Sequence, residues 1–305
     1  MTGASPLPLN LPEAFLRHND DATWVAQLPA LVERLAERWS LTLGPHFPGL
    51  SYNYVAPATR ADGTACVFKV SRHIDETRNE IEALRLWEGR GAARLLGAEP
   101  DMGGLLLERL EPGTMLVEVA ERDDDEATRI AADLLRQLWR PAPAGHALRS
   151  LRSWFDGFDR NRAALRRGER GIPAALFKHA DALLEELVAS TPEDLILHGD
   201  HHHFNILRSV RPEDSERQWR VIDPKGLAGD AGFDICQFLF NPGDEIPSVI
   251  ARRVDIFTAE LSLDRARTRQ WCFEWAMLQA CWDFEDGDDD GVTDNVARAD
   301  LLLGI

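Results

Sequence analysis

The sequence predicts an α+β protein with a small, β-rich N-terminal lobe and a larger, mostly helical C-terminal lobe. Two observations favour this fold: strand-like segments gather before residue 111, and the apolar patterns beyond it are mostly helical. A chain of 305 residues is also too long for one ordinary core. Glu111-Pro112-Gly113 interrupts both kinds of pattern. We therefore expect lobes over residues 1–110 and 111–305.

The N-terminal lobe is expected to combine leading helical structure with a small sheet. Residues 12–40 carry a helical stripe of apolar side chains. Asp62-Gly63 between two β-like runs is a hairpin signal, and Gly89-Arg90-Gly91 ends a helical pattern. The other expected elements are strands over 51–58, 64–70, 93–98 and 104–110 and a helix over 74–88.

The C-terminal lobe is expected to be helical except between residues 195 and 223, where two short strands flank a loop. In the last expected helix Trp271, Trp275, Leu278 and Trp282 lie on one stripe, which is typical of core packing. The expected helices cover about residues 115–139, 148–166, 173–190, 246–262 and 264–284.

Composition excludes several classes of function. The net charge of −17 argues against nucleic acid and anionic membranes as partners. No apolar run is long enough to span a membrane, and the first ten residues lack the features of a signal peptide. The four scattered cysteines predict reduced, mostly buried thiols of a cytoplasmic protein. The acidic surface suits solubility or a cationic ligand, and the oligomeric state stays open.

The most informative segment is His198–Leu207, with the sequence HGDHHHFNIL, followed by an Asp at the end of an apolar run, Asp223. The spacing H-x-D-x-x-x-x-N and then Asp is that of a kinase catalytic loop with its metal-binding aspartate. Phosphoryl transfer needs a carboxylate beside the acceptor hydroxyl, here Asp200. It also needs hard oxygen ligands for Mg²⁺, here Asn205 and Asp223. Ordinary turn chemistry explains either motif alone, but the ordered pair favours a two-lobed protein-kinase-like fold.

An upstream lysine supports this interpretation. Lys69 lies in the otherwise apolar strand Cys66–Val70, so its charge must leave the core or find a partner. In a kinase such a lysine holds nucleotide phosphates and pairs with a Glu on the next helix. At about 100° per residue, Glu80 falls on the apolar face of the expected helix and Glu82 lies roughly opposite. We therefore expect Glu80 to be the partner and Glu82 to be solvated.

Several further segments between residues 54 and 287 carry a family resemblance. They are Tyr54–Pro57, Phe68–Val70, Asn79-Glu80, Ala83–Trp87, Leu106–Gly113, His198–Asp200, Asn205–Leu207, Ile222–Gly226, Gly229-Asp230, Phe233-Asp234 and Glu285–Gly287. With these segments the chain resembles the aminoglycoside phosphotransferase and choline-kinase-like superfamily. More narrowly it is similar to the streptomycin 6-kinase and hydroxyurea phosphotransferase group. The loop motif is shared across the superfamily, whereas IDPKG and LLLERLEPG are more particular to this group.

The resemblance implies roles for individual residues. Asp200 would be the catalytic base, Asn205 and Asp223 the Mg²⁺ ligands, and Lys69 with Glu80 the pair that positions the ATP phosphates. The backbone from Glu108 to Leu110 would bind the adenine edge. Asp234 would anchor the catalytic loop by accepting hydrogen bonds from its backbone. The lobe over 1–110 would then bind nucleotide, and the lobe over 111–305 would hold the catalytic loop and the acceptor.

Two features depart from the usual kinase pattern. No G-x-G-x-x-G covers the phosphates, and Pro48–Asn53 is the candidate covering segment, with Ser51 and Asn53 as possible nucleotide contacts. Three consecutive histidines, His201–His203, invite a zinc site. Neighbouring residues of an extended loop point in alternate directions, and no Cys or Glu completes a tetrahedral set. Packing, surface exposure, or one histidine near the phosphates or the acceptor are the remaining interpretations.

The last feature is an acidic run at the end of the expected helix 264–284, DFEDGDDD over residues 283–290. Acids at a helix C-terminus interact unfavourably with the macrodipole, so the presence of this acidic run needs an explanation. A cationic substrate is one, with Asp283, Glu285 and Asp286 as candidates and Asp230 behind them. A solvated turn is the other.

Together these features predict an ATP- and Mg²⁺-dependent O-phosphotransferase for a small molecule. The resemblance points to a cationic aminoglycoside such as streptomycin, hence to antibiotic resistance. A metabolic kinase of an amino alcohol or sugar is one alternative. A kinase-shaped nucleotide-binding scaffold without turnover is the other. The sequence does not name the acceptor, because fold and phosphate machinery are shared across acceptors.

Overall fold

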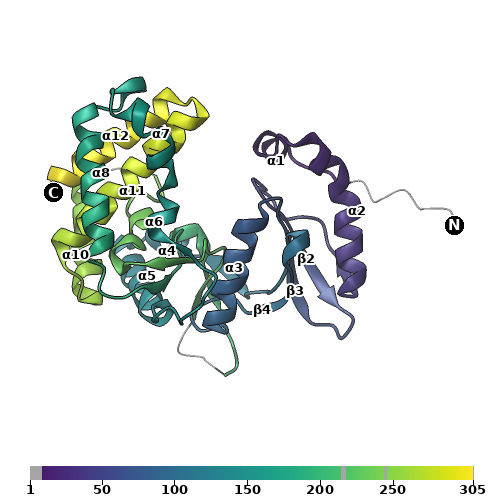
Figure 1. Cartoon of the computed structure of the whole chain (residues 1–305). Coiled ribbons are helices and arrows are strands. Elements are labelled where there is room, and N and C mark those ends of the chain that lie inside the picture. The colour runs from purple at the N-terminus through teal and green to yellow at the C-terminus, as the bar shows by residue number, and fades with distance from the viewer. Residues whose placement is uncertain (1–8, 214–217, 244–245, 305) are drawn as a thin grey trace.

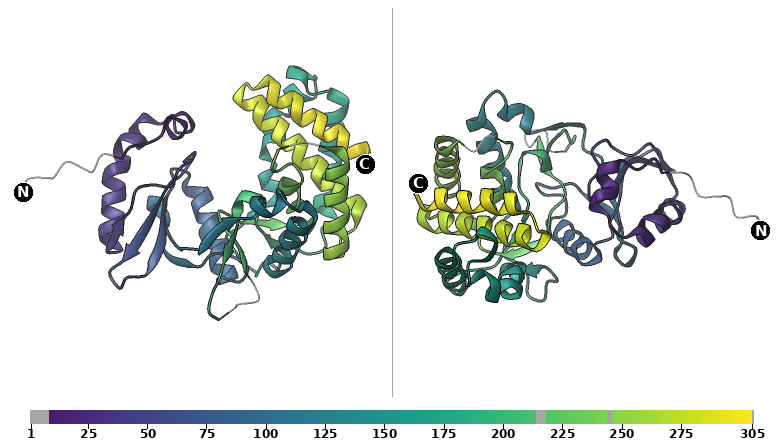
Figure 2. Two further views of the ribbon diagram at one scale, coloured as in Figure 1. Left: turned by 180° about the vertical axis from the view of Figure 1, so that it is seen from behind. Right: turned by 90° about the horizontal axis from the view of Figure 1, so that it is seen from above.

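The computed structural model describes residues 9–213, 218–243 and 246–304. The chain forms a sheet-containing N-terminal part and a mostly helical C-terminal part, which lie side by side (Figure 1). The purple and blue elements make up the first part, and the green and yellow helices belong to the second. Residues 22–38 and the last described helix, residues 289–304, lie at opposite ends of the molecule, as the rear and top views confirm (Figure 2).

The N-terminal part is built on a five-stranded antiparallel sheet in the order β1-β2-β3-β5-β4. Its strands are β1 (Leu41–Leu43), β2 (Tyr54–Arg60), β3 (Ala65–Val70), β4 (Leu95–Glu99) and β5 (Gly104–Glu108). Two helices, α1 (Glu13–His18) and α2 (Ala22–Arg38), precede the sheet, and α3 (Ile74–Trp87) follows β3.

The alternation of side chains along β3 places its lysine. Phe68 and Val70 join a core formed with Leu28, Val32 and Leu35 of α2. Successive strand residues point to opposite faces, so Lys69 points away from that core and toward α3. In the same way Leu106 of β5 packs toward α2, while Leu105 and Leu107 join the core that α3 shares with the C-terminal part.

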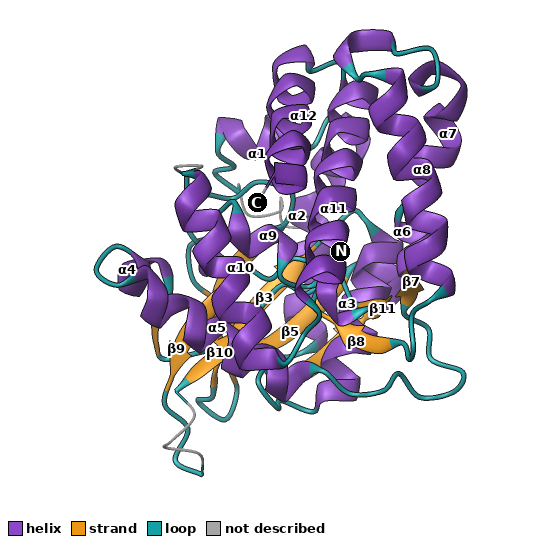
Figure 3. Cartoon of the chain, turned by 90° about the vertical axis from the view of Figure 1, so that its left-hand side faces the viewer, coloured by secondary structure: helices purple, strands orange, loops and turns teal. Residues whose placement is uncertain are grey.

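The C-terminal part surrounds two three-stranded sheets with helices. In Figure 3 the strands lie in the lower half, and helices α7, α8, α11 and α12 form the upper half. The strands are β6 (Pro112–Met115), β7 (Arg149–Ser150), β8 (Leu195–Leu197), β9 (Ile206–Ser209), β10 (Trp219–Val221) and β11 (Leu227–Gly229). The helices are α4 (Val117–Ala120), α5 (Asp124–Leu138), α6 (Leu151–Trp154), α7 (Asp156–Leu165), α8 (Ala174–Ala189), α9 (Cys236–Leu239), α10 (Pro247–Leu261), α11 (Arg265–Asp286) and α12 (Asp289–Gly304).

The two small sheets place the predicted catalytic loop. One sheet has the order β10-β9-β6 and the other β7-β11-β8. β8 leads directly into His198, and β10 leads into Asp223. Val221 pairs with Ile206 in antiparallel register, so the residue after β10 lies beside Asn205, which precedes β9. The motif residues therefore meet although they are about twenty positions apart.

Several expected elements differ in detail. The expected helix over 12–40 is two helices, because Asp21 caps the start of α2 with its carboxylate. The expected helix over 115–139 divides into α4 and α5, where Asp123 caps α5. The expected helix over 148–166 divides into β7, α6 and α7, where Ser150 caps α6. Helix α12 was not expected at all.

The apolar predictions hold in the structure. Trp271, Trp275 and Leu278 are buried, and Trp282 packs against the same core. All four cysteines are free thiols and buried. Among the described residues, no helix combines the length and the apolar character needed to cross a membrane.

Candidate active site

A cavity of about 470 Å³ lies between the five-stranded sheet and the strands β6, β9 and β10. Its lining combines apolar side chains with charged and amide groups. Val55, Val67, Leu107, Met115, Leu207 and Ile222 contribute apolar side chains, and Asn53, Lys69, Glu80, Asn205 and Asp223 contribute polar ones. Lys69, Glu80 and Asp223 converge within this lining, and an apolar cavity with a few convergent polar groups suits a small polar ligand.

Lys69 is paired as the sequence predicts. Its Nζ donates a hydrogen bond of 2.6 Å to Glu80 Oε2, and both side chains are almost fully buried. It also donates to Asp223 Oδ1. Burial raises the pKa of Glu80 to about 7, although the charge of Lys69 opposes that rise. Glu82 is half-buried and accepts a long bond, 3.4 Å, from the N–H of Ala147 instead.

Asp223 occupies an unusual backbone conformation at the end of β10. Its φ is +58°, a left-handed value that strains any residue other than Gly and that Asp tolerates better than most. Burial by itself would raise its pKa, but the charges of Lys69 and Lys225 lower it well below the ordinary value. The carboxylate is therefore held ionised in the cavity.

The backbone of Asp200 is held by side chains of its own loop. Its N–H donates to His198 Nδ1 over 3.2 Å, and His198 Nε2 lies 3.0 Å from the carbonyl of Ile222. Nδ1 must therefore be the unprotonated nitrogen, and Nε2 carries the proton that it donates to Ile222. Burial lowers the pKa of His198 to about 3, so this neutral tautomer is the one that joins the base to the segment before Asp223.

The prediction that Asp234 anchors the loop is confirmed. Its carboxylate accepts hydrogen bonds from the backbone N–H of His198 at 3.0 Å and of Gly199 at 2.7 Å. The indole of Trp139 donates a third bond of 3.0 Å. The side chain is almost fully buried, so it shapes the loop from behind.

The residues predicted to bind magnesium offer a suitable donor set. Asn205 Nδ2 donates to the carbonyl of Asp200 over 3.0 Å, which leaves Oδ1 as the atom able to face a metal. With Asp223 this gives one carboxylate and one amide oxygen. Among the described residues, no group of three or more His, Cys, Asp or Glu side chains could hold a metal by itself. Mg²⁺ needs only one or two protein oxygens, because phosphates and waters complete its octahedron.

The three histidines take different positions. His201 and His203 are fully buried; His203 stacks on Phe238 at 3.7 Å between ring centroids. His202 turns toward Asp200: its Nε2 lies 3.5 Å from Asp200 Oδ1 and 3.1 Å from Asn205 Nδ2. Of the interpretations left open, packing therefore applies to His201 and His203, and proximity to Asp200 applies to His202.

The segment predicted to bind adenine lines the cavity. Glu108, Arg109 and Leu110 all border it. The side chain of Glu108 points away from a ligand role, because Arg211 holds it through Nε at 2.9 Å. Only the backbone of Glu108 is thus available, as the resemblance implies.

The covering segment is only partly as predicted. Asn53 borders the cavity, whereas Ser51 does not. Ser51 is exposed, and its carbonyl accepts a 3.0 Å bond from Asn19 Nδ2 at the end of α1. The side chain of Ser51 is therefore turned away from the cavity, and its role as a nucleotide contact stays a prediction.

The acidic run has structural partners that the sequence did not reveal. Asp283 accepts a 2.7 Å bond from Asn295 of α12. Glu285 accepts two bonds from Arg160 of α7, at 2.9 and 3.0 Å. Asp289 and Asp290 occupy the first turn of α12, where negative charge is favourable. Asp286 stays exposed. The helix-dipole argument for a cationic substrate is therefore corrected: α12 and Arg160 explain most of the run.

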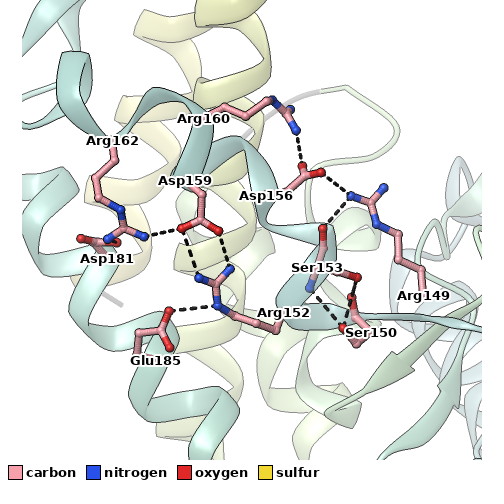
Figure 4. A network of polar contacts seen from close by, with 10 residues as sticks. All are labelled: Arg149, Ser150, Arg152, Ser153, Asp156, Asp159, Arg160, Arg162, Asp181 and Glu185. Carbon is pink, nitrogen blue, oxygen red and sulfur yellow. Dashed lines mark hydrogen bonds and ion pairs between the residues drawn. The ribbon is translucent and has the colours of Figure 1, made fainter.

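Nearby carboxylates are also paired. Figure 4 shows Asp156 between Arg149 and Arg160, and Asp159 between Arg152 and Arg162. The ion pairs are half-exposed, so each contributes little to stability. They nevertheless occupy the carboxylates with the protein's own guanidinium groups.

Asp230 does not lie beside the catalytic loop. β11 runs antiparallel to β8, so that Leu227 pairs with Leu197 and Gly229 with Leu195. Asp230 therefore follows the end of β11 farthest from Asp200. Its carboxylate accepts a 2.8 Å bond from Arg267 Nε and another of 2.8 Å from the N–H of Gly232. The role of Asp230 as an acceptor contact stays a prediction, and this buried carboxylate already has a cation in Arg267.

Sequence reasoning missed three polar side chains of this region. Lys225 lies 4.0 Å from Asp200, and its position two residues after Asp223 was a signal within the quoted IDPKG segment. His202 stood within the loop motif but could not be separated from its neighbours. Arg211 had no signal, because its partners Gly89, Ala92 and Glu108 are more than a hundred residues away.

The sequence of this chain is similar to those of known kinases. Residues 38–287 match the family described as aminoglycoside/hydroxyurea antibiotic resistance kinase. The chain belongs to this family. A streptomycin 6-kinase from Streptomyces glaucescens is 38% identical over 297 residues, covering 92% of this chain and 91% of the relative. A hydroxyurea phosphotransferase from Kitasatospora aureofaciens is 37% identical over 307 residues, covering 98% and 86%.

Solved structures confirm the two-lobed kinase-like fold. A choline kinase from Streptococcus pneumoniae has a TM-score of 0.62 at 14% identity, covering 92% of this chain and all (100%) of the other. The GDP complex of aminoglycoside 2'-phosphotransferase-IIIa has a TM-score of 0.62 at 13% identity, covering 91% and 97%. Membership of the family makes the chain a phosphotransferase, and the distant structural relatives show the fold alone.

Proposed function

We propose that this protein uses ATP and Mg²⁺ to phosphorylate a hydroxyl group of a cationic aminoglycoside such as streptomycin. The observation that carries the phosphotransfer part is the arrangement around one cavity of Lys69, Glu80, Asn205 and Asp223, with Asp200 beside them. Each member of the set that kinase chemistry requires is present. A nucleotide-binding scaffold without turnover would be expected to lack one of them.

In this proposal each residue acts on a defined atom. Asp200 orients the acceptor hydroxyl and takes its proton, while Lys69, held by Glu80, binds the nucleotide phosphates. Asn205 and Asp223 would hold Mg²⁺, which supplies charge neutralisation to the phosphates when bound. The apolar end of the cavity would hold the purine against the backbone of Glu108 and Leu110, and Asn53 would lie over the phosphates.

The same proposal assigns roles to the two parts of the chain. Residues 1–110 would bind the nucleotide, and residues 111–305 would carry the catalytic loop and the acceptor. Support comes from the cavity, to which β2, β3 and β5 contribute Val55, Val67 and Leu107, and from Asp200, which belongs to the loop after β8.

The acceptor class is supported by relatives and by charge. Relatives named streptomycin 6-kinase are 38% and 33% identical to this chain, and the net charge is −17. We propose Glu285 and Asp286 as the carboxylates that receive a guanidinium or ammonium group. The substrate would compete with the half-exposed Arg160 for Glu285, since guanidinium groups bind carboxylates in the same bidentate geometry. Asp283 is set aside, because its bond to Asn295 holds α12.

Hydroxyurea is a second candidate acceptor. It is favoured by one observation, the 37% identity over 98% of this chain to a hydroxyurea phosphotransferase. Hydroxyurea is small and uncharged, so it would not need Glu285 or Asp286. The two candidates therefore make opposite predictions for variants of these carboxylates.

The decisive experiment measures ADP release with a panel of acceptors, namely streptomycin, hydroxyurea and choline, followed by mass spectrometry of the product. Wild-type protein should phosphorylate streptomycin. In the Glu285→Gln/Asp286→Asn variant the KM for streptomycin should rise roughly tenfold, while the KM for ATP stays unchanged. The Asp290→Asn/Asp294→Asn variant, which removes the same charge from α12, should behave as wild type. Turnover of hydroxyurea alone would overturn the aminoglycoside assignment, and turnover of choline alone would point to a metabolic kinase.

A further inference from the structure

Lys225 lies beside the base in a position that no role described so far requires. Its Nζ is 4.0 Å from Asp200 Oδ2 and 4.0 Å from Glu76 Oε2 of α3. These are loose ion pairs, because a hydrogen bond to a carboxylate is about 2.8 Å long. Among the described residues, none accepts a hydrogen bond from this ammonium group, whose side chain is 30% exposed.

The contrast with Lys69 shows what is unusual. Lys69 donates to two carboxylates and is buried with them. Lys225 carries three donors and has only distant carboxylates on either side. Burial by itself lowers the pKa of Lys225, but the carboxylates of Asp223 and Asp200 raise it above the ordinary value. A charged group that is partly withdrawn from water and lacks a hydrogen-bond acceptor is suited to an anionic ligand.

The backbone around Lys225 fixes the direction of its side chain. Its own N–H donates to the carbonyl of His198 over 2.7 Å. Gly226 has a φ of +64° and lies under α3, where a Cβ atom would meet the carbonyl oxygen of Asn79 at 2.2 Å. Gly199 lies on the other side, where a Cβ atom would meet Lys225 Cβ at 3.1 Å. The lysine is therefore wedged between the catalytic loop and α3, with its ammonium group at Asp200.

Lysine is rare in this chain, so its presence at position 225 supports a specific role for an ammonium group there. The chain has 34 basic residues, and only three of them are lysines: Lys69, Lys178 and Lys225. Lys69 pairs with Asp223, the predicted metal ligand, and Lys225 lies beside Asp200, the predicted base, whereas Lys178 is exposed on α8. The other 31 basic residues are arginines. A compact ammonium group on a flexible stem fits a narrow space and can follow a moving phosphoryl group better than the wider, planar guanidinium group can.

We propose that Lys225 is a further catalytic residue, whose ammonium group binds the terminal phosphoryl group of the nucleotide during its transfer to the hydroxyl held at Asp200. This inference rests on the proposed kinase function. Lys69 and Lys225 would then divide the phosphates between them, with Lys69 near Asp223 and Lys225 near Asp200. Charge on the transferring phosphoryl group spreads over its outer oxygens, and a fixed cation beside the acceptor stabilises that charge.

The test compares nucleotides that differ only in the terminal phosphate. Calorimetry with Mg²⁺ measures the Kd of ADP, of ATP and of ADP with aluminium fluoride, which mimics the phosphoryl group in transit. In Lys225→Met the Kd of ADP should stay within about twofold of wild type. The Kd of ATP and of the aluminium fluoride complex should each rise roughly ten- to hundredfold, the range for one hydrogen bond to a charged group. Lys225→Arg should recover part of the loss.

Two controls separate this role from a structural one. Glu76→Gln removes the charge of the other carboxylate next to Lys225. It should leave all three Kd values near wild type, because Glu76 is half-exposed and its 4.0 Å distance from Lys225 Nζ makes the ion pair weak. Lys178→Met removes the remaining lysine and should also behave as wild type. If Lys225→Met unfolds in urea much earlier than wild type, Lys225→Gln supplies the same comparison with a polar side chain.

Each outcome has one meaning. A selective loss of affinity for ATP and for the aluminium fluoride complex supports the proposal. Equal weakening of ADP and ATP in Lys225→Met and in Glu76→Gln would show that the lysine only ties α3 to the loop, and would overturn it. Unchanged affinities in Lys225→Met would overturn it as well. If wild-type protein bound neither nucleotide, the kinase proposal itself would fail, independently of Lys225.

Discussion

Arg211 joins three segments behind the proposed adenine-binding strand. The guanidinium is buried and donates to the carbonyls of Gly89 at 2.6 Å and Ala92 at 2.9 Å. It also holds Glu108 through both of the carboxylate oxygens. The substitution Arg211→Met keeps the length and apolar stem of the side chain and removes every one of these donors.

The expected loss of stability follows from what is left behind. Glu108, with a side chain 17% exposed, would retain only the 3.0 Å bond from the N–H of Arg94. Removing one partner of a buried ion pair costs about 3–5 kcal/mol. Partial access to water and the remaining bond reduce this, so the free energy of unfolding should fall by about 3 kcal/mol. Adding Glu108→Gln should recover roughly 1–2 kcal/mol, because the unpaired charge is then gone.

Urea unfolding followed by tryptophan fluorescence measures these values. Arg94→Met is the matched control, since Arg94 approaches the same carboxylate at 4.0 Å but is 45% exposed; it should cost no more than about 1 kcal/mol. The KM for ATP should also rise in Arg211→Met, because the backbone of Glu108 loses its support. A loss equal to that of Arg94→Met, or a double variant less stable than Arg211→Met, would refute the reasoning.

Four further expectations concern the catalytic groups. Asp200→Asn should keep the fold and nucleotide binding but lower turnover by roughly two or more orders of magnitude; full activity would exclude Asp200 as the base. Burial raises the pKa of Asp200, and the base must be ionised, so activity should fall with decreasing pH through this raised pKa. The acid limb of the pH profile of kcat/KM should therefore lie above the ordinary value for Asp of about 4, and a limb at that ordinary value would contradict the assignment. Asp223→Ala should abolish the Mg²⁺ dependence of ATP binding in calorimetry, whereas affinity that is equal with and without Mg²⁺ would exclude Asp223 as a ligand. Lys69→Ala and Glu80→Ala should raise the KM for ATP to similar degrees, and a double variant much worse than either would show that they do not act as a pair.

The local parts of the site could be predicted from sequence because their signals are local. Helix α3 was expected within one residue of its bounds, Ile74–Trp87, since its apolar period and its glycine stop lie within the segment itself. Lys69 stood out because strand alternation makes a charge in an apolar run conspicuous. Glu80 followed from the helical period. Asp234 followed from the resemblance, which carries long-range information that no single sequence pattern holds.

The acidic run shows where such reasoning fails. The sequence of residues 283–290 predicts an unfavourable helix end, because it gives no sign that α12 follows. The following segment begins with Asp289, Asp290 and Gly291, which weakens its helical pattern, and α12 is stabilised by packing along α11. Partners such as Arg160 and Asn295 became visible only in the folded chain.

From the sequence alone, the fold class, the family and the proposed chemistry of the loop after β8 follow, because each is encoded in residue types at short, fixed spacings. The tertiary structure decided which charged groups are free. It paired Asp230 with Arg267 and Glu285 with Arg160, turned His202 rather than His201 toward the base, and left the ammonium group of Lys225 without a close partner. Such pairings join residues from separate helices and strands, so the energy of each charge depends on neighbours that only folding brings together.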